Sequence, residues 1–301
     1  MSPDDLYEIT DDAVAEGAPV LIHALTGFID AGEAGSGLAE HLLNTLPHRV
    51  VARFDIDELY DYRARRPTVV FAEDHFEQYV APQLTLYALR DDADAEFLLL
   101  TGPEPDNRWE RFSEALIRLV RHFGVRLTAG AHGVPLTVPH TRPLGVTSHA
   151  TRPELVTGSN PWEGEIHMPA GAATLLELRL GEAGHDAMGF AVHVPHYLAE
   201  NRYPDAIITL LQSLSRVTGL LLPLGNLEEE ATYVQTLVES QVASNEAVQN
   251  VVHELEAQYD AQTDGPARKE LPTLSDDLPT GDEIAAEAER FLADRETGED
   301  G

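Results

Sequence analysis

Three side chains that can donate or accept protons follow apolar runs of the chain. They are Asp30, Glu104 and His132. In an α/β protein the carboxyl ends of neighbouring strands meet at one edge of the sheet, where ligands usually bind. A histidine close to Glu104 would form an acid–base pair. This arrangement could serve a hydrolase or phosphorylase that acts on a nucleoside-like molecule.

Both carboxylates also have structural explanations. Asp30 can be the N-cap of the following helix, with Glu33 completing a capping box, and carboxylates there satisfy free N–H groups and the helix dipole. The glycine-rich stretch 27–37, which contains Asp30 and Glu33, holds no Lys or Arg. It matches neither the G-x-x-x-x-G-K-[ST] nor the G-x-G-x-x-G phosphate-binding motif. We therefore favour capping over nucleotide binding at Asp30. Glu104, held between Pro103 and Pro105, has no evident capping role and could be a solvated loop carboxylate.

The histidines raise the question of a metal. His193 and His196 have a spacing that could hold one, but a proline lies between them and the motif supplies no third ligand. We expect buried or surface histidines, no metal and no cofactor. No G-x-S-x-G motif marks a nucleophile, so no catalytic residue is assigned.

Polar residues and glycines in the turns that follow the predicted strands form the candidate surface for a ligand or partner. His132, His140 and His196 would converge if their three corners lie at one rim of the sheet. Asp106 is also expected to cap a helix over 107–123. The candidate residues are Gly27, Asp30, Gly32, Glu104, Asp106, Trp109, His132, His140, Arg142 and His196.

Apolar runs and alternation predict the elements that position these residues. The alternating run 84–89 and the buried run 96–101 flank a turn, which predicts a hairpin and hence a mixed sheet. A helical spacing of apolar residues predicts helices at 107–123 and 203–218, and shorter helices after Gly37 and after Pro169. The charged stretch 57–66 is expected to be an exposed excursion, and 130–135 a corner. The expected strands are 6–9, 20–25, 49–55, 68–72, 84–89, 96–101, 125–131, 145–150 and 188–194.

Composition excludes several classes of partner. The chain of 301 residues carries 52 acidic and 20 basic residues, for a formal net charge of −32. Such a charge repels nucleic acid and anionic lipid. The chain has no cysteine, no apolar run long enough to span a bilayer and no basic leader at its start. A cytoplasmic location is therefore expected.

The last quarter of the chain has a different sequence pattern from the rest. The helical pattern over 228–262 weakens between 239 and 246, which fits either two helices or one kinked helix. Beyond 263 the sequence is acidic and contains prolines, which is typical of a flexible linker, before an amphipathic pattern at 282–294. We expect a core at 1–225, a long helical arm at 226–262 that packs on the core or a neighbouring subunit, and a tail at 263–301.

Several of these motifs together resemble the PAC2, or proteasome assembly chaperone, family in its actinobacterial branch. The resemblance covers about residues 15–260 and rests on Gly27-Phe-Ile-Asp-Ala-Gly32, Gly102-Pro-Glu-Pro-Asp with Trp109, Gly130-Ala-His-Gly-Val-Pro135, Pro139-His-Thr-Arg142 and Val194-Pro-His-Tyr-Leu-Ala-Glu200.

The resemblance implies a three-layer α/β/α fold with a mixed, mostly parallel sheet, similar to that of nucleoside phosphorylases and hydrolases. It also implies self-association, as a trimer, and proteasome subunits as partners, because eukaryotic members chaperone assembly of the 20S α-ring. Some prokaryotic relatives dock through a C-terminal hydrophobic-Tyr-X tail. Residues 297–301 read Thr-Gly-Glu-Asp-Gly, so docking by that route is not expected.

Two hypotheses of different classes follow. The first is a non-enzymatic, self-associating protein-binding factor that resembles an assembly chaperone. The alternative is a small-molecule hydrolase or phosphorylase that uses the rim of strand-end corners. The missing nucleophile and metal motifs favour the first.

Overall fold

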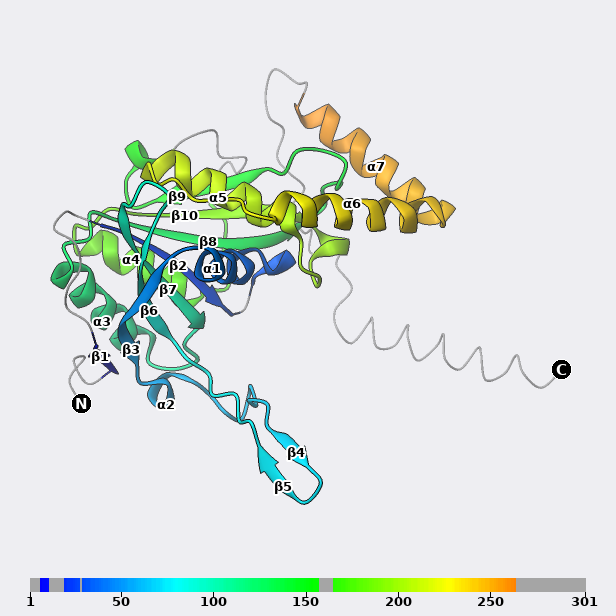
Figure 1. The fold of residues 1–301 in the computed structure, drawn as a ribbon. Helices are drawn as coiled ribbons and strands as arrows, with labels where there is room; N and C mark the ends of the chain where they lie inside the picture. The colour runs from blue at the N-terminus through cyan, green and yellow to red at the C-terminus, as the bar shows by residue number, and fades with distance from the viewer. Residues whose placement is uncertain (1–5, 11–18, 28, 157–164, 264–301) are drawn as a thin grey trace.

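The computed structural model describes residues 6–10, 19–27, 29–156 and 165–263 (Figure 1). An eight-stranded sheet lies at its centre. In spatial order its strands are β1 (Tyr7–Ile9), β3 (His48–Phe54), β6 (Thr85–Arg90), β7 (Glu96–Pro103), β2 (Val20–Thr26), β8 (Leu127–Leu136), β10 (Ala187–Pro195) and β9 (Val146–Ala150).

The predicted mixed sheet is confirmed. Strands β7, β2, β8 and β10 are parallel, whereas the outer pairs β1–β3, β3–β6, β6–β7 and β10–β9 are antiparallel. The parallel part is thus narrower than the mostly parallel sheet expected. The reason is that β6 and β7 form the predicted hairpin and both edge strands run against their neighbours.

Helices cover both faces of the sheet, and the predicted three-layer α/β/α arrangement is confirmed. Strand β2 shows how the faces are filled: Val20 and Ile22 belong to one core cluster and Leu21 to the other. The first face is covered by α1 (Ala34–Thr45) and α5 (Pro204–Thr218), and the second by α3 (Trp109–His122) and α4 (Ala172–Glu182) (Figure 1). The described residues also include the short 3₁₀ turns η2 (Ala31–Glu33), η3 (Pro153–Leu155) and η4 (His196–Leu198).

The corner expected at 130–135 is instead part of strand β8. Pairing between β8 and β10 continues through Leu136, opposite Pro195. Glycines in this stretch serve close packing rather than a turn. A Cβ on Gly130 would lie 2.6 Å from the His23 ring, and one on Gly133 would lie 2.0 Å from the Ala31 carbonyl oxygen.

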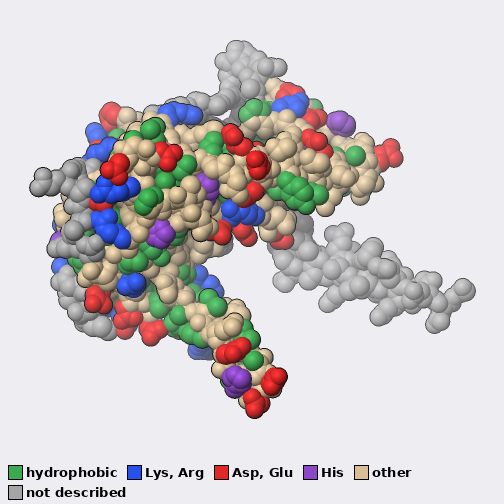
Figure 2. Space-filling model, in the orientation of Figure 1, with side chains coloured by type: hydrophobic (Ala, Val, Ile, Leu, Met, Phe, Trp, Pro, Cys, Tyr) green, Lys and Arg blue, Asp and Glu red, His purple; other side chains and the backbone are tan. Residues whose placement is uncertain are grey.

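The excursion between β3 and β6 has two parts. The first forms a short helix, α2 (Ile56–Leu59), whose Leu59 is fully buried. The second is a hairpin of β4 (Val70–Ala72) and β5 (His75–Glu77), which form a separate two-stranded sheet. The strand expected at 68–72 therefore exists, but it lies outside the central sheet because the hairpin extends away from the body (Figures 1 and 2).

The long helical pattern near the C-terminus forms two helices, α6 (Leu227–Ala243) and α7 (Glu246–Thr263). They meet at the short turn that joins them, beyond the end of the sheet, and diverge from that turn (Figure 1). The amphipathic pattern at 282–294 lies outside the described residues. Among the described helices, none is long and apolar enough to cross a membrane.

Candidate functional site

The ten candidate residues fall into two main groups rather than one rim. Gly27, Asp30, Gly32, Glu104 and His132 lie where β2, β7 and β8 approach the starts of α1 and α4. With their neighbours His23, His149 and Glu177, they form what we call the strand-end cluster. The second group, with His140 and Arg142, lies at a groove beside α5.

Asp30 caps α1, but in a different way from the predicted capping box. Its carboxylate accepts hydrogen bonds from the backbone N–H groups of Gly35 and Ser36, at 2.7 and 2.9 Å, and from the Ser36 hydroxyl at 2.8 Å. The Gly133 N–H donates a fourth, at 3.3 Å. Glu33 has a positive φ of 50° and makes no side-chain cap. The predicted capping box does not form because the chain turns through Gly32 (φ 68°) before α1 begins.

Glu104 also caps a helix, one that begins 68 residues later in the chain. Its Oε1 accepts a 2.5 Å hydrogen bond from the Ala172 N–H, at the start of α4. The side chain fills the space beside Gly27, where a Cβ would lie 2.0 Å from Glu104 Oε2. The prediction that Glu104 could be a solvated loop carboxylate is therefore wrong. Its charge is directed to a helix N-terminus, where an anion is stabilised.

Histidines and Glu177 occupy the second sheet face beneath α4. His149 Nδ1 lies 2.9 Å from Glu177 Oε1. Burial lowers the pKa of His23 to about 4. Burial also lowers the pKa of His132, with His149 lowering it further and Asp30, Glu177 and Glu104 opposing the shift. Both rings are therefore neutral at pH 7. His132 does approach Glu104, but a histidine with a low pKa and a carboxylate bound to a helix form no free acid–base pair.

Asp106 and Trp109 lie next to this cluster, at the start of α3. Asp106 does not cap α3 as predicted: its Oδ2 accepts from the Asp61 N–H at 2.7 Å and from Arg65 at 2.6 Å. The predicted cap does not form because α3 begins at Trp109, with Arg108 (φ 59°) as its N-cap residue, so Asp106 lies two residues before the capping position. Arg65 also donates to the Glu104 carbonyl oxygen at 2.7 Å. The Trp109 indole N–H donates to the Pro105 carbonyl oxygen, at 2.6 Å.

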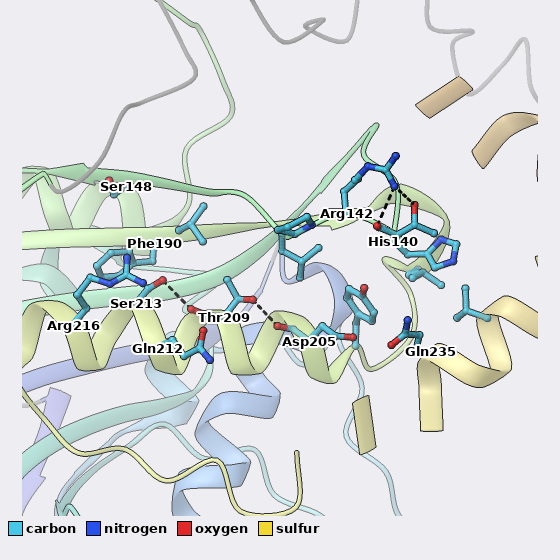
Figure 3. Close-up of a pocket in the computed structure, with 17 residues that line it drawn as sticks. His140, Arg142, Ser148, Phe190, Asp205, Thr209, Gln212, Ser213, Arg216 and Gln235 are labelled. Carbon is cyan, nitrogen blue, oxygen red and sulfur yellow. Dashed lines mark hydrogen bonds between the residues drawn. The ribbon is translucent and has the colours of Figure 1, made fainter. Parts of the chain in front are cut away.

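A groove of about 700 Å³ lies on the first sheet face, between α5, the outer strands β10 and β9, the loop 140–144 and α6. Its volume is in the usual range for ligand-binding clefts. Figure 3 shows polar side chains of α5 facing Ser148 and Phe190 across it. We call this the α5–β9 groove.

His140, His196 and Tyr197 form an aromatic cluster at one end of the α5–β9 groove. The Tyr197 hydroxyl accepts from the His140 backbone N–H at 2.8 Å and lies 2.7 Å from His140 Nδ1. The other ring nitrogen of His140 is Nε2. That Nε2 atom is buried and has no hydrogen-bond partner among the described residues. His196 stacks edge-on to Tyr197 and is exposed.

Arg142 ties α7 to this end of the groove. Its guanidinium forms two 2.7 Å bonds to Asp260 and a 3.3 Å bond to Glu256. These carboxylates raise the pKa of Arg142, with its hydrogen bonds to Asp260 as the main cause. The Tyr259 hydroxyl adds a bond to the Pro143 carbonyl oxygen, at 2.9 Å. Arg142 is thus committed to α7 rather than free for a ligand.

Comparison with known families now identifies the chain. The model of the PAC2 family matches residues 24–242, which is more than half of the sequence. The chain belongs to the PAC2 family. All ten candidate residues lie inside the PAC2 match, whereas α7 lies beyond it.

Solved structures include similar PAC2-like chains from actinobacteria. A Mycobacterium tuberculosis protein of unknown function is 46% identical, with a TM-score of 0.82, and the match covers 86% of this chain and 90% of that one. A Corynebacterium glutamicum protein of unknown function is 39% identical, with a TM-score of 0.83 and coverage of 87% and 99%. No curated protein matches the chain.

A third structure carries a functional description. It is a proteasome-assembly chaperone homologue from M. tuberculosis, 25% identical to this chain, with a TM-score of 0.71 and coverage of 77% and 99%.

Sequence reasoning missed the polar side of α5 in this PAC2 fold. Asp205, Thr209, Gln212, Ser213 and Arg216 all line the groove. Their spacing of four, three, one and three residues puts them on one side of a helix. The signal was thus present in the sequence, beside the apolar stripe that was used to predict the helix.

Proposed function

We propose that this PAC2 protein is a non-enzymatic, self-associating factor that binds proteasome subunits and assists their assembly. The observation that carries the proposal is membership of the PAC2 family together with likeness to the proteasome-assembly chaperone homologue, of which the match covers 99%. Protein partners also suit the charge of −32, which disfavours nucleic acid and anionic membranes. A cytoplasmic location is part of the same proposal.

Self-association, which we propose to give a trimer, is supported as an association, without regard to the number of copies, by the hairpin of β4 and β5. An isolated two-stranded hairpin is only marginally stable in water, yet this one extends from the body with large apolar side chains exposed. Phe71 is 59% exposed and Phe76 72%. A second copy of the chain is the partner we propose for this surface, which comprises Val69, Val70, Phe71, Phe76, Tyr79 and Val80.

The hydrolase or phosphorylase alternative has no support in the site geometry. Its two carboxylates, Asp30 and Glu104, accept hydrogen bonds from helix N-termini. His132 has a lowered pKa through burial. The rim that would have to carry the reaction is used to hold the fold together.

Binding to proteasome subunits can be tested by native mass spectrometry. The full-length protein would be mixed with purified 20S α subunits and, separately, β subunits from the same organism. We expect a stable complex with one of these sets, or faster formation of α-rings in its presence. Neither complex nor acceleration at low salt and micromolar concentration would overturn the proposal.

Self-association has its own test, by light scattering after size-exclusion chromatography. The wild type should have the mass of a trimer, and the double variant Phe71→Ser/Phe76→Ser should be a monomer with an unchanged fold. Leu178→Ser is the matched control, because Leu178 is 56% exposed on α4, away from the hairpin. A monomeric wild type, or a double variant that remains trimeric, would refute trimer formation through the hairpin.

A further inference from the structure

The α5 wall of the α5–β9 groove is a polar stripe with a charge at each end. Asp205 and Arg216 are the two ends, and Thr209, Gln212 and Ser213 lie between them (Figure 3). The ends are eleven residues apart, which corresponds to about 16 Å along a helix. The stripe thus presents a carboxylate, three uncharged polar groups and a guanidinium in one line.

Neither terminal charge of the stripe is used by the fold. Among the described residues, neither the Asp205 carboxylate nor the Arg216 guanidinium has a hydrogen bond or ion pair; only the backbone oxygen of Asp205 is bonded, by Thr209. Burial raises the pKa of the Asp205 carboxyl, with no opposing partner. A partly buried carboxylate without a cation is unfavourable, and a ligand that brings one would relieve this cost.

The opposite wall of the groove is more apolar. Phe190 of β10 is buried, and Leu144 and Val146 extend the apolar surface toward the loop 140–144. Ser148 of β9 adds one hydroxyl. A ligand lying along the groove therefore meets polar groups on one side and apolar side chains on the other, as an extended peptide does with its backbone and alternate side chains.

We propose that the α5–β9 groove binds an extended peptide segment of about five residues, with a basic group at Asp205 and a carboxylate at Arg216. The length follows from the span of the stripe, since an extended chain rises about 3.3 Å per residue. The Thr209 and Ser213 hydroxyls donate to carbonyls of α5, so their oxygens accept from N–H groups of the peptide, while the Gln212 amide can both donate and accept. A nucleotide fits less well, because a phosphate at Arg216 leaves Asp205 without a cation.

The test is affinity selection of peptide pools by the full-length protein, read by mass spectrometry. One pool holds N-acetylated pentapeptides with lysine first, four randomised positions and a free C-terminal carboxylate. A second pool is C-terminally amidated, and a third has glutamate in place of lysine. We expect the first pool to be retained at least fivefold more than either of the others.

Variants assign the two ends of the peptide separately. Arg216→Gln should abolish the preference for the free carboxylate, and Asp205→Asn should abolish the preference for lysine. Arg53→Gln is the matched control, an exposed arginine on β3 at the other end of the sheet. Circular dichroism and melting temperature establish that each variant is folded.

Equal retention of the three pools by the wild type would overturn the proposal, as would preferences that persist in both groove variants. This outcome is independent of the proteasome experiment. A protein can bind α subunits through its hairpin or another face while selecting no peptide, and it can select peptides of this charge pattern without binding a proteasome subunit.

Discussion

The strand-end cluster and the α5–β9 groove differ in what their charged side chains touch. In the cluster, Asp30 accepts four hydrogen bonds and Glu104 accepts one from the start of α4. In the groove, Asp205 and Arg216 have no side-chain partner among the described residues. The carboxylates of the cluster are bound to backbone N–H groups, whereas the two charges on the α5 wall of the groove have no partner among the described residues.

This difference shows that a position at the carboxyl edge of a sheet is not enough to make a carboxylate a functional group. An acid that satisfies backbone N–H groups is already occupied, and removing it mainly harms stability. An acid without a partner costs stability in the folded protein and is available to a ligand. The two regions should therefore respond in opposite ways to the same kind of substitution.

The largest expected change in the free energy of unfolding comes from lowering the pH, because His23 of the strand-end cluster is then protonated in the unfolded chain. The folded protein lowers the pKa of His23 from 6.5 to about 4, so the unfolded chain binds the extra proton between these values. The free energy of unfolding should fall as the pH falls through this range, by about 3 kcal/mol from this group. Urea titrations at several pH values measure this fall.

Two variants show whether His23 is responsible for this pH dependence. His23→Gln should flatten the curve between pH 6.5 and 4. His75→Gln, at an exposed position on the hairpin, should leave it unchanged. An equally steep curve in His23→Gln would show that another group carries the acid sensitivity.

The next largest effect is expected from Asp30→Ala. The substitution leaves the N–H groups of Gly35 and Ser36 without their acceptor, and we expect a loss of about 2 kcal/mol in the free energy of unfolding. Asp92→Ala, at an exposed acidic position, is the control and should change little. A loss below about 0.5 kcal/mol for Asp30→Ala would contradict the view that the cluster is structural.

A smaller effect, of opposite sign, is expected for Asp205→Asn. The pKa of this carboxyl is raised by burial, so the charged form destabilises the folded protein above that pKa. Removing the charge should increase the free energy of unfolding at pH 7, by up to about 0.5 kcal/mol after solvent screening. A decrease would mean that Asp205 has a stabilising partner, and the contrast between the two regions would disappear.

The smallest effect is expected from deleting the residues after Thr263. Because that sequence is acidic and interrupted by prolines, we expect it to bury little surface, and the melting temperature of the body should hardly change. A fall of more than about 5 °C, which corresponds to roughly 1–2 kcal/mol for a domain of this size, would show that the tail packs on the body.

Much of the fold could be predicted because its strands are continuous apolar runs. Val20–Thr26 is buried through Leu25, and β10 is buried throughout. The β6–β7 hairpin was also evident, from alternation on one side of a turn and a buried run on the other. Such signals are local, and burial on both faces of a sheet makes them strong.

The partners of the candidate residues could not be predicted, because they come from distant parts of the chain. Glu104 caps a helix that begins at Ala172, and Asp106 is bound by Arg65. At Asp106 the local rule predicted the wrong partner because α3 begins only at Trp109, after Arg108 as its N-cap residue, and the carboxylate binds Arg65 instead. The acids were recognised as unusual, but which N–H group or cation each one meets depends on the topology.

The hairpin of β4 and β5 leaves the body and returns to it at nearly one point. The Val80 N–H bonds the Thr68 carbonyl oxygen at 3.0 Å, and the flanking strands β3 and β6 are hydrogen-bonded neighbours in the sheet. The residues between 68 and 80 can therefore be exchanged for a tight turn or for a foreign sequence without altering the path of the chain around them. The molecule carries a natural graft site, where evolution or an engineer can change what the surface presents while the sheet keeps its register.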